Sequence, residues 1–409
     1  MELIRGARYK QRTMIQPPAQ FTRRAVALSA ASFAILGGCL TLPGTLLPLL
    51  LERFAIRLVE AGSMLALQPV GYLLAVLAAG RLIATYGMRA VLAAGMATSA
   101  AGFAGFGLIS TWSGGAAMML VSGLGFGIME VGTNSLLIVV GGERRANLLN
   151  LAHLFFGVGS FVTPVLAAHA VAGGVSWRLT FFAAAAATAS VALGWGLFDV
   201  HGIVPTQPAA GAAHRALRSR TALLCASMLG VYVGTEVGIG GWLTKYMVTV
   251  RGVTLTYAGN ALSVYWLGLA AGRIALSVLS HRIREEKLLT GLTLGAAVAS
   301  CSVLIVESPI GAVIGAGLTG LAFSGIFPAV IALGGRSHPH DTAGVTSVMI
   351  AGAGLGGIVI PWTMSAVAEG AGLVAGMALY PVLCAALLGQ ALLVRATLPA
   401  SAAVATRTT

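Results

Sequence analysis

The sequence predicts an all-α membrane protein with twelve transmembrane helices, arranged as two pseudo-symmetric bundles of six. Three observations lead to this prediction: a composition poor in charge, twelve long apolar segments and an internal repeat. Of the 409 residues, 57% are hydrophobic and only 9% are charged, whereas soluble domains carry about 25% charged residues. The composition therefore excludes a soluble enzyme, a nucleic-acid-binding protein and a disordered chain.

Hydropathy and turn residues divide the chain into apolar segments, each long enough for the roughly 20 residues that cross a bilayer. The segments cover residues 25–51, 60–83, 88–110, 114–140, 146–171, 177–198, 220–248, 256–280, 287–306, 308–334, 342–368 and 371–396. One long polar interruption separates the first six from the last six. The predicted organisation is an N-terminal tail (1–24), a first bundle (25–198), a linker (199–219), a second bundle (220–396) and a C-terminal tail (397–409).

Charge placement predicts the orientation of these segments. With both chain ends on one side, 20 of the 25 Lys and Arg residues fall on that side, and this count includes Arg273. Basic residues collect on the cytoplasmic side of membrane proteins. The net charge of +13 is therefore interpreted as topology, and it predicts a multi-pass protein of the cytoplasmic (inner) membrane with both termini in the cytoplasm.

The two halves repeat one another. A shift of 197 residues places Gly123-Leu124 on Gly320-Leu321, Gly157 on Gly354 and Pro164 on Pro361. Two parallel six-helix repeats are typical of one large class of secondary transporter, in which the solute site lies near the bilayer midplane between the repeats. The repeat therefore predicts a site between the two bundles.

Two acidic residues lie well inside predicted spans, Glu130 in the first half and Glu236 in the second. Charge in hydrocarbon is costly, so an intramembrane acid indicates function. Such a carboxyl can exchange a proton or hold a cation; the alternative is a structural carboxyl that hydrogen-bonds a neighbouring helix. We predict that both acids bind the coupling ion, a proton or sodium.

Polar and aromatic side chains on nearby spans are candidates for binding the solute. The predicted ligands are Gln68, Asn134, Asn150, His153, Tyr232, Trp242, Asn260, Tyr265 and Phe327. Sugar hydroxyls would satisfy the buried amides and sugar faces would stack on the rings, although interhelical hydrogen bonds would serve the amides equally well. A proton relay is an alternative role for His153, and anchoring at the membrane interface is the alternative for Trp242 and Tyr246.

The sequence contains no pattern that predicts a metal site or an organic cofactor. The four cysteines are unpaired in apolar stretches, with no CxxC spacing. Glycine runs such as Gly123, Gly125 and Gly127 lie inside apolar spans, where small residues permit close helix packing rather than phosphate binding.

The loop between the second and third spans resembles a motif of the major facilitator superfamily, G-x-L-A-D-R-x-G-R-R. Its residues here run Gly80-Arg81-Leu82-Ile83-Ala84-Thr85-Tyr86-Gly87-Met88-Arg89, with Ala84 in the place of the aspartate. The resemblance extends over nearly the whole chain. It implies the major facilitator fold and a gating role for Gly80, Arg81, Gly87 and Arg89.

Three further stretches resemble the fucose–galactose–glucose symporter family. They begin at Gly123 and end at Asn134, begin at Asn150 and end at Gly159, and begin at Tyr232 and end at Glu236. This resemblance implies uptake of sugars. The proton-coupling aspartate of the family's first helix aligns with Gly44, so coupling must pass through Glu130 and Glu236, use another ion or be absent.

These observations predict a monomeric secondary transporter that moves a small polar solute, such as a monosaccharide, across the lipid bilayer by alternating access, driven by a proton or sodium gradient. An exporter of drugs or amphipathic metabolites by proton antiport is the alternative with the same fold. A membrane-embedded enzyme would need a nucleophile–base set, which the spans lack. A sensor would need a sizeable soluble domain, for which the sequence has no room.

Overall fold

The computed structural model describes residues 19–200, 212–279, 283–338 and 341–397, and within these ranges twelve helices are long and apolar enough to cross a membrane. The predicted fold class is confirmed. The helices of the first bundle are α1 (Ala19–Thr45), α2 (Leu47–Phe54), α3 (Leu58–Tyr86), α4 (Met88–Leu108), α5 (Trp112–Gly141), the 3-10 turn η1 (Gly142–Arg144), α6 (Arg145–Ala172) and α7 (Trp177–Leu197). Those of the second bundle are α8 (Ala212–Ala216), α9 (Arg220–Val250), α10 (Leu255–Leu279), α11 (Glu285–Ile305), α12 (Pro309–Phe323), α13 (Ile326–Ser337), α14 (Thr342–Ala371) and α15 (Leu373–Thr397).

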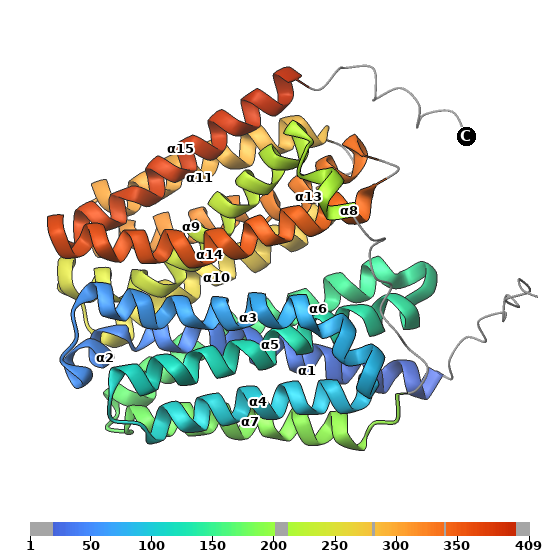
Figure 1. The fold of residues 1–409 in the computed structure, drawn as a ribbon. Coiled ribbons are helices and arrows are strands. Elements are labelled where there is room, and N and C mark those ends of the chain that lie inside the picture. The colour runs from blue at the N-terminus through green and yellow to red at the C-terminus, as the bar shows by residue number, and fades with distance from the viewer. Residues whose placement is uncertain (1–18, 201–211, 280–282, 339–340, 398–409) are drawn as a thin grey trace, which may run out of the picture.

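The two bundles lie side by side, and α1 begins, α7 ends, α9 begins and α15 ends at the same end of the molecule (Figure 1). We call this the linker end, and the end that carries α2 the opposite end. Buried side chains form one apolar cluster in each bundle, and Phe156 packs against both clusters.

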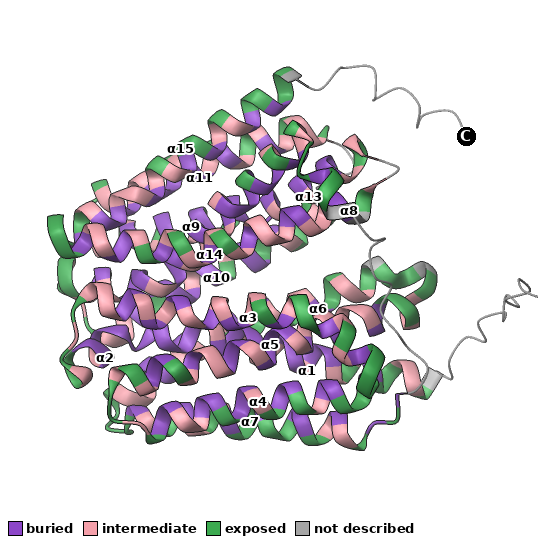
Figure 2. Ribbon diagram, in the orientation of Figure 1, coloured by how far each residue is buried: buried purple, intermediate pink, exposed green. Residues whose placement is uncertain are grey.

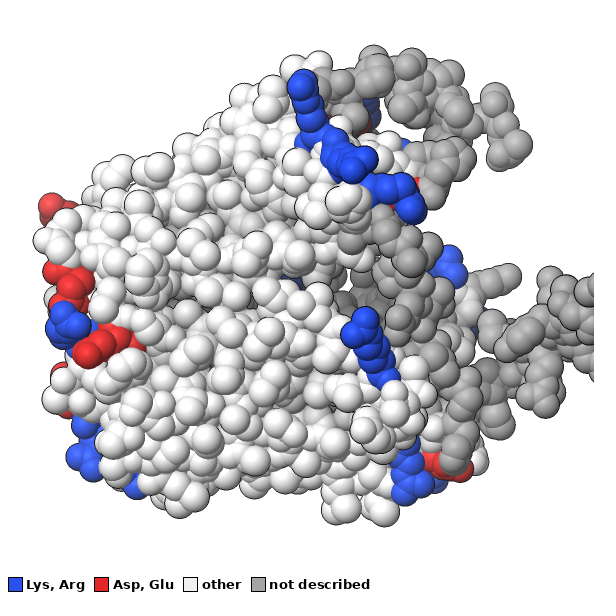
Figure 3. Space-filling model, viewed as in Figure 1, with Lys and Arg blue, Asp and Glu red and all other residues white. Residues whose placement is uncertain are grey.

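The outer surface between the two ends of the molecule is apolar, as contact with a bilayer requires. Large apolar side chains such as Leu77, Leu197, Val278 and Ile305 are more than two-thirds exposed, and exposed positions run along the outer faces of the helices (Figure 2). On the face shown in Figure 3, charged residues gather at the two ends and leave a broad uncharged band between them. Lipid tails rather than water are therefore the solvent of this band.

Two of the predicted spans are broken. The segment 25–51 divides into α1 and α2 at Leu46, and the segment 308–334 divides into α12 and α13 at Ser324 and Gly325. In each case a proline follows within a turn, Pro48 and Pro328. A proline has no N–H to donate to the carbonyl four residues earlier and its ring clashes there. This weakens the helix at both breaks, although α1, α3, α6, α14 and α15 each continue past a proline.

The internal repeat recurs in the packing. A Cβ on Gly71 would meet the carbonyl oxygen of Leu120 at 2.1 Å, and one on Gly268, 197 residues later, would meet that of Gly317 at 2.1 Å. The same holds for Gly123 and Gly320, which lie against the carbonyls of Gln68 and Tyr265. Equivalent glycines thus permit equivalent helix contacts, α3 with α5 and α10 with α12.

The bundles meet along two equivalent helix pairs, which we call the α3–α14 seam and the α6–α10 seam. In the first, Gly62 packs against Ser365; in the second, Gly259 packs against Ala168. The 197-residue shift maps one contact onto the other, because Gly62 corresponds to Gly259 and Ala168 to Ser365. The seams are therefore related by the pseudo-symmetry of the fold.

Toward the linker end the helices of the two bundles diverge, whereas at the opposite end they converge (Figure 1). Hydrogen bonds join the bundles at the opposite end. The Leu58 backbone N–H donates to Glu369 Oε2 at 2.8 Å, and Trp362 Nε1 donates to Ser63 Oγ at 3.2 Å. The molecule is therefore held together at the opposite end.

Candidate functional site

A small cavity lies between the bundles, where α1, α3, α9, α10 and α14 meet. It has a volume of about 30 Å³, enough for one or two water molecules. Its lining is apolar and backbone except for Thr41, Gln68 and the indole of Trp266. In this state the walls close around a space too small for a hexose, so solute would enter only after the bundles separate further.

Two polar groups of the cavity lining differ in how they are satisfied. Gln68 Nε2 donates to Ser122 Oγ on α5 at 3.1 Å, which holds the buried amide against the wall. Trp266 Nε1 is buried and makes no hydrogen bond. A buried N–H without an acceptor is costly, so Trp266 offers a donor to any hydroxyl that enters. The predicted ligands did not include Trp266.

The acid of the first bundle, Glu130, lies on α5 and hydrogen-bonds with Tyr72 on α3. No ion pair joins this carboxyl to a lysine, arginine or histidine of the described ranges. One turn further along α5, Asn134 Oδ1 is buried without a donor. Glu130 therefore has a neutral partner, and the neighbouring amide has an unused acceptor.

The acid of the second bundle, Glu236, lies on α9 among aromatic rings. The Tyr232 hydroxyl donates to Glu236 Oε1 at 2.8 Å, and the Tyr265 hydroxyl donates to the Glu236 backbone carbonyl at 3.2 Å. The Tyr232 ring packs against Phe323 and Phe327, with ring centres 5.4 and 6.3 Å apart. The structure thus brings four of the predicted residues together: Tyr232, Glu236, Tyr265 and Phe327.

Arg273 is the residue that the sequence analysis misplaced. It was counted among the charges at the helix ends, but it lies inside the span Leu255–Val278, close enough for its charge to act on Tyr232 and Glu236 of α9. His153 on α6 also feels its charge, and the His153 ring packs against Phe33 with centres 4.7 Å apart. The position of Arg273 in the sequence gave no sign of its proximity to Tyr232 and Glu236, because α9 and α10 come together only in the folded chain.

Four other residues considered in the sequence analysis lie outside the cavity lining. Trp242 and Tyr246 are fully buried, which corrects the alternative of an interface anchor, because both rings pack inside the second bundle. Asn150 and Asn260 are exposed and are not among the residues that line the cavity. Their predicted contact with solute would need another conformation.

The loop between α3 and α4 turns at Gly87, whose φ of 83° is open to glycine at little cost. Arg89 Nε donates to the carbonyl of Gly196 at the end of α7, at 2.7 Å. Arg81 is exposed. In this state Arg89 joins two helices of the same bundle, so the predicted gating role of this loop stays a prediction.

The structure supplies a physical reason for Gly44. A Cβ at this position would lie 2.6 Å from the Gly240 carbonyl oxygen and 2.8 Å from the Gly241 Cα. The backbones of α1 and α9 touch here, beside the cavity. An aspartate cannot occupy this position without separating the bundles.

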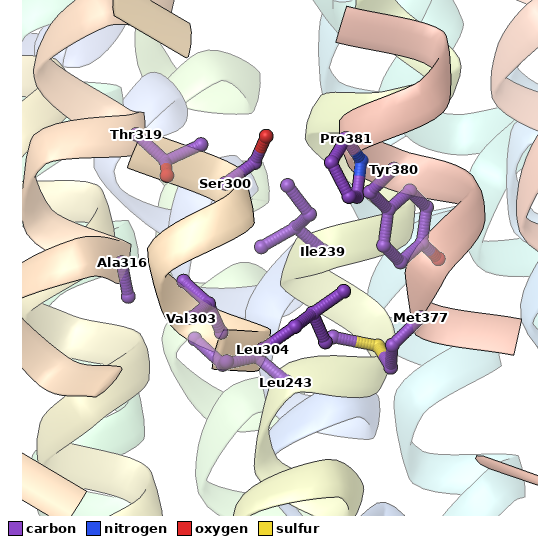
Figure 4. A pocket seen from close by; sticks show the side chains of 10 residues that line it. All are labelled: Ile239, Leu243, Ser300, Val303, Leu304, Ala316, Thr319, Met377, Tyr380 and Pro381. Carbon is purple, nitrogen blue, oxygen red and sulfur yellow. The ribbon is translucent and has the colours of Figure 1, made fainter. Parts of the chain in front are cut away.

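A second cavity, of about 10 Å³, lies within the second bundle among α9, α11, α12 and α15 (Figure 4). Its walls are mainly apolar, with Leu243, Val303 and Met377 among them, and the Tyr380 hydroxyl is buried without a partner. It lies within one bundle, and Ile239 in its wall is one turn from Glu236 on α9. This cavity is a packing defect rather than a solute site.

Comparisons with known proteins agree with this geometry. The Major Facilitator Superfamily model matches residues 28–361. The glucose/mannose transporter GlcP of Bacillus subtilis is 25% identical over 341 residues, which cover 78% of this chain and 81% of that protein.

Solved structures show the same fold. The nucleoside transporter NupG superposes with a TM-score of 0.77 at 10% identity, over 92% of this chain and 99% of the other. The fucose:proton symporter FucP of E. coli superposes with a TM-score of 0.61 at 20% identity, over 90% of this chain and 98% of the other. With twelve spans, two related bundles and a family model that matches most of its length, the chain belongs to the Major Facilitator Superfamily and is a secondary transporter.

Proposed function

We propose that this transporter moves a neutral, hydroxylated solute such as a monosaccharide, coupled to a proton or sodium gradient. The relatives named for glucose and mannose and for fucose and protons support the solute class. The geometry supports it as well, because the central cavity presents an amide, a hydroxyl and an unpartnered indole N–H and no charged side chain among its lining residues.

The state of Glu130 is the observation on which the coupling depends. It lies in a span, and its partner is the neutral phenol of Tyr72. An ionised carboxyl without a counter-charge costs about 3 kcal/mol or more in the bilayer. Binding a proton or a cation removes that cost and permits α5 to move against its neighbours. Glu130 therefore serves as the group that takes up and releases the coupling ion.

The arrangement of the bundles supports alternating access. We infer that the linker end faces the cytoplasm, since basic residues collect there. The described state, divergent at the linker end and hydrogen-bonded at the opposite end, then corresponds to an inward-facing conformation with the outer side closed. The seams are the surfaces along which the bundles rock.

Uptake into proteoliposomes tests the solute class. We expect at least one labelled hexose, pentose or deoxyhexose to accumulate under an imposed proton or sodium gradient, because the cavity groups are hydroxyl-binding and uncharged. Trp266→Phe, which removes the free N–H but keeps most of the ring, should raise the KM about threefold or more. Export of cationic drugs with no sugar uptake would support the exporter instead.

Cysteine labelling tests the orientation. Single cysteines in residues 1–18 and 201–211 should resist an impermeant maleimide in intact cells and react after permeabilisation, because the positive-inside rule places them in the cytoplasm. A cysteine at Glu307, in the loop between α11 and α12 at the opposite end, is the control and should react in intact cells. The reverse pattern would show that the orientation is wrong.

A further inference from the structure

Glu369 is an acid of the second bundle that contacts the first bundle at the opposite end. It is exposed near the end of α14, and its Oε2 accepts a hydrogen bond of 2.8 Å from the Leu58 backbone N–H. Leu58 is the first residue of α3. We call this hydrogen bond the cross-bundle cap, because it joins the start of one helix to a residue 311 positions away in the other bundle.

The start of α3 is a place where a carboxylate is stabilising. The first N–H groups of a helix have no partner within the helix and carry a partial positive charge. The residue before α3 is Arg57, whose side chain has no acceptor to offer, and Glu60 Oε2 accepts from the Arg57 N–H at 2.8 Å. The Leu58 N–H is therefore capped by the other bundle.

The cap ends a row of contacts along the α3–α14 seam. Trp362, Ser365 and Glu369 follow one another at helical spacing and lie on one face of α14. Trp362 Nε1 donates to Ser63 Oγ at 3.2 Å, and Ser365 packs against α3 about one turn closer to the opposite end. The two helices lie side by side (Figure 1), so this face of α14 contacts the first bundle as far as the start of α3.

The equivalent seam has no such cap. Under the 197-residue shift, Glu369 corresponds to Ala172 and the first residue of α10 to that of α3. An alanine side chain has no acceptor. The first turn of α10 is capped from its own loop instead, where Thr254 Oγ1 accepts from the Tyr257 N–H at 3.3 Å. A helix start of this kind can thus be capped locally, which indicates that Glu369 serves to join the bundles.

We propose that Glu369 controls opening at the opposite end, because it caps α3 only while the two bundles are closed there. The inference rests on the proposed alternating access and names the residue that stabilises closure on this side. Both groups of the cap reach water once the bundles separate. The cap therefore biases the equilibrium between the closed and open states by a few-fold and leaves the movement reversible.

Two buried positions report separation of the bundles. Ser365 on α14 faces α3, Ala168 on α6 faces α10, and the two correspond under the 197-residue shift. Both are fully buried. In purified protein in detergent, Ser365→Cys and Ala168→Cys should react with a water-soluble maleimide only while the opposite end is open. Labelling of the chain without either reporter, measured in parallel, accounts for the native cysteines.

Glu369→Ala should raise the labelling rate of both reporters about threefold or more, because the open state no longer competes with the cap. Glu369→Gln keeps an acceptor oxygen but loses the charge, so its labelling rates should lie between those of wild type and Glu369→Ala. Glu307→Ala is the matched control, since it removes an exposed acid at the same end, in the loop between α11 and α12. Its labelling rates should equal those of wild type.

Three results of this comparison would overturn the proposal. Unchanged labelling in Glu369→Ala would show that the cap does not affect closure. An equal increase in Glu307→Ala would assign the effect to net charge at this end. An increase at Ser365→Cys without one at Ala168→Cys would show local fraying of α3 rather than separation of the bundles along both seams.

The donor side provides an independent test. Leu58→Pro removes the N–H at the first helical position, where proline is well accepted, and the extended backbone of Arg57, with ψ of 165°, suits a following proline. Leu58→Ala is its control, because it keeps the N–H and loses the side chain. Glu369→Ala should raise labelling about threefold in Leu58→Ala and leave it unchanged in Leu58→Pro.

An equal increase in both backgrounds would overturn the proposal. If Leu58→Pro does not fold, equal labelling of wild type, Glu369→Gln and Glu369→Ala overturns it on the acceptor side alone. The labelling uses neither solute nor gradient. Failure of the proposed function would therefore show separately, as absence of gradient-driven uptake by wild type.

Discussion

Glu130→Gln should abolish concentrative uptake while leaving exchange of solute intact. The amide keeps the size and hydrogen-bonding capacity of the protonated carboxyl, including the contact with Tyr72, but it cannot release a proton or hold a cation. The bundles can still rock, because no bare charge forms in the bilayer. Without coupling, a neutral solute equilibrates, so its accumulation ratio should fall to about one under any imposed gradient.

The measurement compares accumulation with counterflow in the same proteoliposomes. Glu307→Gln is the control, since it makes the same chemical change at an acid outside the spans, in the loop after α11, and it should accumulate solute as wild type does. Gradient-driven accumulation that survives in Glu130→Gln would refute the assignment of Glu130. A wild type that responds to no gradient would identify a facilitator, with Glu130 as a structural or solute-binding residue.

Gly44→Leu should reduce transport by at least about tenfold, a loss equivalent to about 1.4 kcal/mol of conformational free energy. At this position α1 touches the backbone of α9, with only 2.6 Å between a Cβ and the Gly240 carbonyl oxygen. A branched side chain there prevents the bundles from closing beside the cavity at the opposite end. The transporter should then remain open on that side, and the inward-facing state described here should be lost.

Accessibility at the opposite end measures this shift directly. A cysteine replacing Ser63, whose hydroxyl accepts a hydrogen bond from Trp362 across the bundles, should react with an impermeant maleimide faster in Gly44→Leu than in an otherwise wild-type chain. Gly291→Leu is the matched control, because a Cβ at Gly291 meets no atom within 4 Å; both its transport and its labelling should be unchanged. Normal uptake by a folded Gly44→Leu protein would show that the α1–α9 contact does not open and close.

Long-range patterns in the sequence predicted the fold because the bilayer imposes them on the chain. Twelve apolar segments and the 197-residue repeat are properties of composition and spacing, and both recur in the structure, the repeat as equivalent contacts at Gly71 and Gly268. The breaks at Leu46 and at Ser324 were not predicted. Pro48 and Pro328, which follow these breaks, lie inside apolar segments, and hydropathy carries no information about the backbone there.

The candidate site was predictable only in part. Glu130 and Glu236 stood out because an acid in an apolar span is costly, and Tyr232 was recognised through its place one turn from Glu236 on the same helix. Arg273 was not recognised, since its partners come from α9 and α6 rather than from its own helix. Helical spacing relates residues on one helix, and only packing relates residues on different helices.

By itself, the sequence determined that the chain spans a membrane twelve times, that its halves are related and that in each half one acid lies well inside a span. These follow from the free energy of transferring residues into hydrocarbon, which depends on composition along the chain. The tertiary structure alone decided which acid lies near an arginine, why glycine stands at position 44 and which helices bring Arg273 and His153 near one another. Such facts depend on distances of a few ångströms between helices far apart in sequence, and electrostatic and steric energies change steeply over those distances.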